Sequence, residues 1–185
     1  MTIVCIGDSL TSGYGVPPGQ GWVERCNVAS ADLWINAGIP GDTSGGVLTR
    51  PYRDAISMRS DYVVLMSGYN DILLTGSFEA AKPNIMAAMQ HCIAAGVRPV
   101  LGIPPPSRPK PDNPWHDLIE EDRFYRQSEA FCDWLHRLAK SFGYHTADFR
   151  ARFPAGDSAL FQADGIHPSA AGHRRMAEVF LDSHP

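Results

Sequence analysis

The sequence predicts an α/β protein, a three-layer sandwich whose five-stranded parallel sheet lies between two layers of helices. Three observations predict this class. Short apolar runs of strand length alternate with longer segments of helical pattern along the chain. Two of the helical segments stop at a glycine, the residue that most easily adopts the left-handed conformation at a helix end. The 185 residues, 44% of them hydrophobic, suffice for one domain with a full core.

The elements can be assigned in chain order from this pattern. Strands are expected at 3–6, 33–37, 62–66 and 98–103, with a weaker fifth at 144–149. Helices are expected at 22–29, 45–58, 78–95, 118–142 and 169–182, the third and fourth stopping at Gly96 and Gly143. Right-handed crossovers between such strands give a doubly wound, flavodoxin-like sandwich. Ligands then bind beyond the carboxyl ends of the strands, where segments 7–15, 38–46 and 67–74 emerge.

The composition narrows the possible partners. The net charge of −4 provides no basic field for nucleic acid, and no apolar run approaches the ~20 residues of a stable membrane span. The first residues have a strand pattern rather than that of a leader peptide, so we expect a cytoplasmic protein. The four cysteines are scattered without a C-x-x-C pair, and we expect buried, reduced thiols, with no metal and no cofactor.

The stretch IGDSLTSGYG, residues 6–15, directly follows the first expected strand. It holds more hydroxyl groups than a turn needs, and Ser9 stands where the strand would lead into a helix. Such a position presents a side chain and backbone N–H groups to a negatively charged group, either a phosphate or the oxyanion of a reacting ester. For Asp8 we expect a local cap that holds the loop rather than a catalytic role.

Acyl transfer by a serine needs a base, a carboxylate that orients the base, and donors for the oxyanion. Ser9 can supply the nucleophile and His167 the base, while Asp164, three residues earlier, can hold the imidazole. The oxyanion can bind the backbone N–H groups of Ser9 and Gly41 and the side-chain amide of Asn70. This constellation predicts a serine hydrolase that cleaves an ester and binds no metal.

Each motif alone has an ordinary structural explanation. Gly-Asp-Ser-Leu is most often a capped strand–helix turn, Asp164-Gly165 is a turn dipeptide, and Asn70-Asp71 is a helix cap. Here, however, the motifs occur together, and each follows an expected strand or precedes the last helix. The set as a whole therefore favours catalysis.

The four motifs resemble those of the SGNH hydrolases, or GDSL-type esterases, over nearly the whole chain from Ile6 to about His173. The likeness is greatest to the small bacterial thioesterase I and lysophospholipase-like acylhydrolases. It implies a single SGNH hydrolase domain over residues 1–185 that acts on a small-molecule ester through an acyl-enzyme. The family's four blocks match Gly7-Asp8-Ser9-Leu10, Asn36 through Thr43, Gly68-Tyr69-Asn70-Asp71, and Asp164-Gly165-Ile166-His167. Its defining residues are then Ser9, Gly41, Asn70 and His167.

The resemblance also places the acyl pocket just after the oxyanion loops. Many relatives have a glycine where this chain has Tyr69, and a ring there would shorten the cleft. We therefore expect carboxylic esters of short to medium acyl chains as substrates, with thioesters as a second class. The expected lining is apolar and consists of Leu10, Tyr69, Ile72, Leu73, Leu74, Trp115 in a proline-rich loop, and Ile166.

Other functions stay open at this point. A flavodoxin-like binding module would use the first loop for a flavin phosphate, but it would leave Asn70 and the Asp164–His167 pair without a role. A phosphotransferase using Asp8 would want a second carboxylate where Leu10 stands. A carbohydrate-binding module would need aromatics on one flat face, whereas the four tryptophans are dispersed. If the protein is a hydrolase of this kind, the alternative is an acetylesterase that acts on sugars. The sequence does not determine the oligomeric state.

Overall fold

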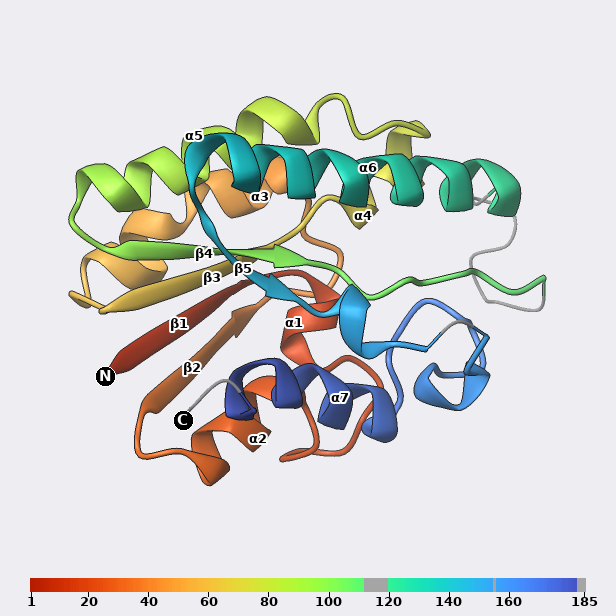
Figure 1. The fold of residues 1–185 in the computed structure, drawn as a ribbon, viewed down its shortest axis with the longest axis horizontal. Coiled ribbons are helices and arrows are strands. Elements are labelled where there is room, and N and C mark those ends of the chain that lie inside the picture. The colour runs from red at the N-terminus through yellow and green to blue at the C-terminus, as the bar shows by residue number, and fades with distance from the viewer. Residues whose placement is uncertain (112–119, 155, 183–185) are drawn as a thin grey trace.

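The computed structural model describes residues 1–111, 120–154 and 156–182. Its centre is a five-stranded, entirely parallel sheet with the strand order β2-β1-β3-β4-β5 (Figure 1). The strands are β1 (Thr2–Gly7), β2 (Leu33–Gly38), β3 (Tyr62–Met66), β4 (Arg98–Ile103) and β5 (His145–Asp148). The chain moves outward from β1 first to one side and then to the other. The strand order therefore reverses at β1, and a crevice opens at the carboxyl ends of β1 and its neighbours.

Helices cover both faces of the sheet (Figure 1). One layer consists of α1 (Ser9–Ser12), α2 (Trp22–Ala29) and α7 (Ala170–Leu181). The other consists of α3 (Ser44–Thr49), α4 (Tyr69–Thr75), α5 (Ala81–Ala94) and α6 (Glu121–Phe142). Short 3-10 turns at Arg150–Arg152 and Ser158–Leu160 lie between β5 and α7. The predicted α/β sandwich with five parallel strands is confirmed.

The expected helix over 45–58 is two separate pieces. The α-helix α3 ends at Thr49, and a π-helical turn follows at Tyr52–Ile56. Pro51 stands between them and has no N–H with which to continue the helical ladder. The expected helix over 118–142 begins at Glu121 within the described residues, and its first two predicted positions lie outside them.

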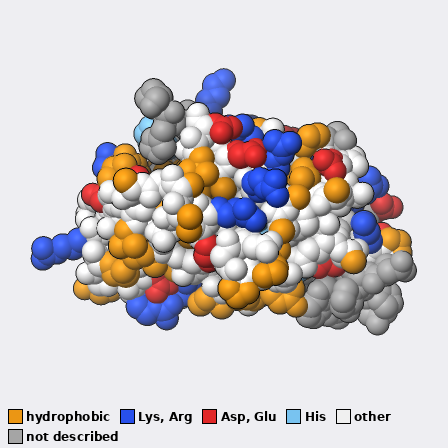
Figure 2. All heavy atoms as spheres, turned by 90° about the horizontal axis from the view of Figure 1, so that it is seen from below, with side chains coloured by type: hydrophobic (Ala, Val, Ile, Leu, Met, Phe, Trp, Pro, Cys, Tyr) orange, Lys and Arg blue, Asp and Glu red, His pale blue; other side chains and the backbone are white. Residues whose placement is uncertain are grey.

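Aromatic side chains fill both spaces between sheet and helices. On the side of α2 and α7, Trp22 is fully buried and stacks on Phe180 at 5.6 Å, with Phe149 at 5.0 Å. On the other side, Phe131 packs against Phe78 and Tyr69. The four cysteines are buried free thiols. Charged and apolar side chains are interspersed over the outer surface of the α2–α7 layer (Figure 2). None of the described helices is long and apolar enough to cross a membrane.

Candidate active site

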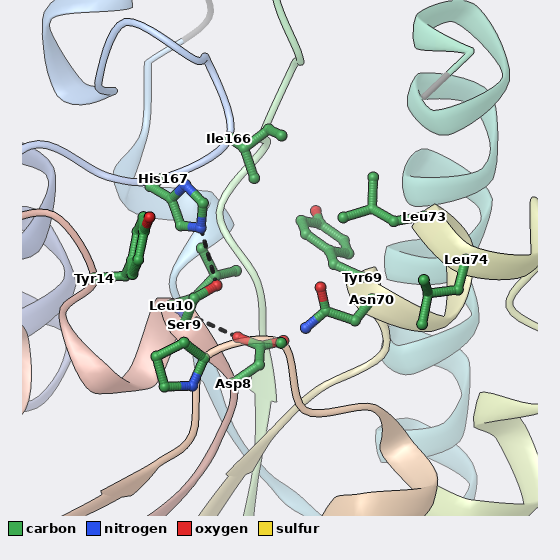
Figure 3. A pocket seen from close by; sticks show the side chains of 12 residues that line it. Asp8, Ser9, Leu10, Tyr14, Tyr69, Asn70, Leu73, Leu74, Ile166 and His167 are labelled. Carbon is green, nitrogen blue, oxygen red and sulfur yellow. Dashed lines mark hydrogen bonds between the residues drawn. The ribbon is translucent and has the colours of Figure 1, made fainter. Parts of the chain in front are cut away.

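A cavity of about 360 Å³ opens where β1, β2 and β3 end (Figure 3). Segments from four parts of the chain meet there: the β1–α1 turn, the loop after β2, the start of α4, and the loop before α7. Its lining is mainly apolar, with a few polar groups gathered at one side, as in most small-molecule sites. The lining residues are Asp8, Ser9, Leu10, Tyr14, Pro40, Gly41, Tyr69, Asn70, Leu73, Leu74, Ile166 and His167.

The turn from β1 into α1 holds Ser9 at the first position of a helix. Asp8 caps this helix, because its Oδ1 accepts a hydrogen bond of 2.9 Å from the backbone N–H of Leu10. A Cβ on Gly7 would lie 2.2 Å from Thr11 Oγ1 and 2.4 Å from the Met66 carbonyl oxygen. Only glycine therefore lets the first strand turn this tightly against the third.

Ser9, His167 and Asp164 form a hydrogen-bonded line. The Ser9 Oγ lies 3.0 Å from His167 Nε2, and His167 Nδ1 lies 2.6 Å from Asp164 Oδ2 (Figure 3 shows the serine–histidine bond). The other oxygen, Oδ1 of Asp164, accepts from the backbone N–H groups of Ile166 and His167. Partial burial raises the pKa of the Asp164 carboxyl, but these hydrogen bonds outweigh it and the pKa lies below its usual value. The carboxylate is thus ionised at neutral pH, where it can hold the imidazole Nδ1–H.

The loop that carries His167 is pinned at both ends. The backbone N–H of Gln162 donates to the His167 carbonyl oxygen at 2.8 Å, and that of Ser169 donates to Leu160 O at 2.8 Å. On its outer side, the N–H of Arg108 donates to Gly165 O. The Ser169 hydroxyl then caps α7 through the N–H of Gly172. These backbone contacts hold the loop in place independently of the contact between His167 and Ser9.

The loop after β2 makes a tight turn whose third residue is Gly41. The N–H of Asp42 donates to Ile39 O at 3.0 Å, and Gly41 has φ +81°, the pattern of a Pro-Gly type II turn. The Asn70 side chain, at the start of α4, donates through Nδ2 to Asp42 O at 2.8 Å and points into the cavity (Figure 3). Among the described residues, the N–H groups of Ser9 and Gly41 have no hydrogen-bond acceptor. All three predicted oxyanion donors therefore border one space.

The structure places most, but not all, of the predicted pocket residues on the cavity. Leu10, Tyr69, Leu73, Leu74 and Ile166 line it. Ile72 does not: it is 2% exposed and belongs to the hydrophobic core. The reason is helical geometry, since successive residues of α4 point in directions about 100° apart and cannot all face one cavity. Trp115 lies outside the described residues.

Two lining residues were missed from the sequence. Tyr14 packs its ring against the His167 imidazole, with ring centroids 4.7 Å apart, and Pro40 precedes Gly41 on the rim. Both stand inside motifs that the sequence had already singled out, so their nearness to Ser9 and Gly41 was the available signal. Asp8, expected as a cap, also faces the cavity. Burial raises its pKa to about 7, although the Leu10 N–H and His167 lower it.

A serine, a histidine and a carboxylate in hydrogen-bonded sequence beside an apolar cavity are the arrangement that serine hydrolases use. The chain belongs to the GDSL-like Lipase/Acylhydrolase family, whose model matches residues 5–175. It is an ester-hydrolysing enzyme, and the resemblance to SGNH hydrolases is confirmed.

Similar proteins are found in several bacteria. The esterase TesA of Pseudomonas aeruginosa is 29% identical over 183 residues, which cover 96% of this chain and 84% of the relative. Thioesterase 1/protease 1/lysophospholipase L1 of Escherichia coli K12 is 26% identical over 186 residues, which cover 97% of this chain and 79% of the relative. The structure of a G-D-S-L family protein described as a putative lipolytic protein from Desulfitobacterium hafniense superposes with a TM-score of 0.83 at 20% identity, covering 98% of both chains. This last likeness concerns the fold.

Proposed function

We propose that the protein hydrolyses carboxylic esters of short to medium acyl chains through a Ser9–His167–Asp164 triad and an acyl-enzyme. The observation that carries the proposal is the line from Ser9 Oγ through the imidazole to Asp164, placed on the wall of the cavity. We propose further that residues 1–185 act as a single SGNH hydrolase domain. The distance of 3.0 Å between Ser9 Oγ and His167 Nε2 supports the proposal, because it lies within the range that proton transfer to a general base needs.

Acylation begins when Ser9 Oγ attacks the ester carbonyl carbon and His167 Nε2 takes the hydroxyl proton. Asp164, ionised, accepts from Nδ1–H and stabilises the imidazolium that forms. The carbonyl oxygen becomes an oxyanion and receives hydrogen bonds from the N–H groups of Ser9 and Gly41 and from Asn70 Nδ2. When the tetrahedral intermediate collapses, the bond to the leaving oxygen breaks and the Nε2 proton passes to the departing alcohol.

Deacylation repeats these steps with water as the nucleophile. His167 Nε2 takes a proton from a water molecule, whose oxygen bonds to the acyl carbon, and the same three donors receive the oxyanion. Collapse releases the carboxylic acid and returns the proton to Ser9 Oγ. The contact between Tyr14 and His167 limits the space in which the imidazole can turn during this cycle.

The acyl chain would lie between Leu10 and the residues of α4. The cavity volume is near the small end of the range for ligand sites, about 300–1,000 Å³. Tyr69 closes it on one side, and Leu73, Leu74 and Ile166 complete an apolar wall. Such a lining favours an acyl chain over a sugar. The name of the Escherichia coli relative includes thioesterase activity, so thioesters of the same acyl groups are included in the proposal.

The test is hydrolysis of p-nitrophenyl esters by the purified protein and its Ser9→Ala variant. Removal of the nucleophile should lower kcat by about 10⁴–10⁶-fold and leave the melting temperature nearly unchanged. Activity of the unaltered protein should survive EDTA. Most of the activity remaining in Ser9→Ala, or its loss with EDTA, would contradict the proposal. Thioester and acetylated-sugar substrates, assayed in parallel, decide the leaving group.

A further inference from the structure

Arg50 is a buried cation directly beneath the candidate active site, and the mechanism above does not use it. It is 6% exposed and follows α3. Each of its five N–H donors has an acceptor. Nε and Nη2 donate to Asp42 Oδ2 at 3.0 and 2.7 Å, Nη1 donates to Ala37 O and Asp54 Oδ2, and Nη2 also donates to Gly7 O. The pattern uses the whole planar guanidinium fork, and a lysine, whose three donors sit on one nitrogen, could not reproduce it.

These acceptors belong to the segments that carry the proposed catalytic groups. Gly7 is the last residue of β1, two positions before Ser9, and Ala37 lies near the end of β2, just before the turn of Gly41. Arg50 Nη2 donates to the Gly7 carbonyl oxygen at 3.2 Å and Nη1 to the Ala37 carbonyl oxygen at 2.9 Å. One rigid side chain therefore joins the ends of the two strands from which the nucleophile loop and the oxyanion loop depart.

Asp42 extends this link to the third oxyanion donor. Its carboxylate accepts from Arg50, while its backbone carbonyl oxygen accepts from Asn70 Nδ2 at 2.8 Å. Asp42 also closes the turn that contains Gly41, because its N–H donates to Ile39 O, so the position of Asp42 affects the turn that carries the Gly41 N–H. Both ends of Asp42 are thus occupied: the side chain by the buried cation and the main chain by the amide that faces the substrate.

The charge of Arg50 matters as well as its shape. The Asp42 carboxylate, only 13% exposed, lies one residue from a group that must stabilise a developing negative charge. Without a counter-ion it would oppose that charge through a medium of low dielectric constant. Arg50, which Asp42 shares with Asp54, lowers this electrostatic cost while the carboxylate positions the loop.

We propose that Arg50 is a positioning residue for the oxyanion hole, acting through Asp42 on Gly41 and Asn70. The inference rests on the proposed function, since it requires that these two residues bind the oxyanion. Arg50 itself touches neither substrate nor reacting atoms. Its contribution should therefore appear in kcat rather than in KM, because a misplaced donor weakens the transition state more than the bound ester.

The experiment is a double-mutant cycle between Arg50→Lys and Asn70→Ala, with kcat and KM measured on p-nitrophenyl butyrate. Asn70→Ala alone should lower kcat by about 10²–10³-fold, the usual loss of one oxyanion donor. Arg50→Lys keeps the charge but not the fork, and should lower kcat by about 10–100-fold with KM within about threefold. The double variant should be more active than the product of the two losses predicts, because part of the effect of Arg50 passes through Asn70 and only the part that passes through Gly41 remains.

Arg152→Met is the control for loss of a guanidinium that bridges a carboxylate and a backbone carbonyl outside the cavity. Arg152 also joins a carboxylate, Asp182, to a backbone carbonyl, that of Glu178, but it lies away from the cavity. Because the Arg152–Asp182 pair is largely exposed, this variant should show only a small change in melting temperature and nearly unchanged kcat. If Arg50→Lys is not recovered folded, Asp42→Ala interrupts the same link from the loop side and should show the same loss and the same coupling to Asn70→Ala.

The failures are distinguishable. If Asn70→Ala keeps its kcat, Asn70 is not an oxyanion donor and the positioning role of Arg50 is overturned, whereas the triad is judged separately by Ser9→Ala. If Asn70→Ala is impaired but Arg50→Lys, or Asp42→Ala in its place, has normal kcat, the positioning role is wrong and the function stands. Losses that multiply fully in the double variant would likewise overturn the role, since Arg50 would then act independently of Asn70.

Discussion

At the scale of single residues, Asp8 combines two demands that conflict. Its carboxylate caps α1 by accepting from the Leu10 N–H, and a cap of this kind is stronger when it is charged. Its side chain is 2% exposed, however, and burial raises its pKa to about 7. The residue that places Ser9 at the helix start therefore carries a carboxyl group that is only partly ionised near neutral pH.

This raised pKa predicts how stability depends on pH. The unfolded chain releases the Asp8 proton near pH 3.9, and the folded protein only near pH 7. Between these values the unfolded state binds fewer protons, so the contribution of Asp8 to stability falls as pH rises and levels off above about 7. Asp8→Asn keeps a cap and removes the ionisation. Its free energy of unfolding should exceed that of the unaltered protein by on the order of 1–4 kcal/mol between pH 4 and 8.

Thermal melts of both proteins from pH 4 to 8.5 measure this difference. Taking the difference between the two proteins cancels the other groups, including Asp164, whose lowered pKa affects stability only at acid pH. Parallel curves would show that Asp8 ionises in the folded protein at its ordinary pKa.

At the scale of elements, α4 presents one stripe of side chains to the cavity and another to the core. Tyr69, Leu73 and Leu74 face the cavity, and Ile72 packs inward. Tyr69 is held firmly, because its hydroxyl donates to Pro105 O at 2.9 Å and its ring meets Phe124 edge-on at 5.3 Å. A ring fixed in this way is a wall rather than a movable gate.

Tyr69 should therefore set the longest acyl chain that binds well. Each methylene accommodated adds about 0.8 kcal/mol, nearly fourfold in binding, until the chain meets the ring. We expect kcat/KM to rise from acetate to short or medium esters and then level off, and Tyr69→Gly to move the peak to longer chains. Tyr69→Phe, which keeps the ring, should have the unaltered profile. The measurement is kcat/KM from acetate to palmitate for all three proteins.

The Tyr69→Gly variant must be assayed well below its melting temperature. Loss of a buried aromatic side chain costs about 3–5 kcal/mol, which lowers stability as well as opening space. A profile that stays unchanged in folded Tyr69→Gly would show that Tyr69 does not bound the pocket. A peak at long chains in the unaltered protein would show that the acyl group runs past the ring on another side.

At the scale of the whole molecule, the site depends on closure between the two ends of the chain. Ser9 and His167 are 158 positions apart and meet because α7 returns to pack on α2. An aromatic cluster makes this contact: Phe180 of α7 stacks on Trp22 and meets Trp34 edge-on at 4.8 Å.

Phe180→Ala should lower the stability of the contact between α7 and α2 and leave the geometry of the site unchanged. Because Phe180 is only partly buried, the free energy of unfolding should fall by about 2–4 kcal/mol, which corresponds to roughly 4–16 °C in Tm for a chain of this size. Because backbone hydrogen bonds at Leu160 and Gln162 hold the His167 loop, kcat at 25 °C should stay within about twofold. Calorimetry and ester hydrolysis on the same preparation test both parts. A large fall in kcat in the folded variant would show that α7 packing itself aligns the imidazole.

Much of this protein could be predicted from its sequence because the relevant signals are local. Buried parallel strands appear as short apolar runs, and a glycine after a helix marks its end, so the five strands and the sandwich follow directly. The candidate site was equally visible, since topology alone brings the carboxyl ends of β1, β2 and β3 to one edge of the sheet. Ser9, Gly41 and Asn70 each stand just after such an end.

The tertiary structure alone decided which side chains meet across these loops. The five hydrogen bonds of Arg50, the contact of Tyr14 with His167, and the inward turn of Ile72 depend on how separate segments pack, and no local pattern encodes them. The raised pKa of Asp8 has the same origin, because it comes from burial by residues distant in sequence. Local propensities specify the elements, whereas the desolvation and pairing of charges belong to the assembled fold.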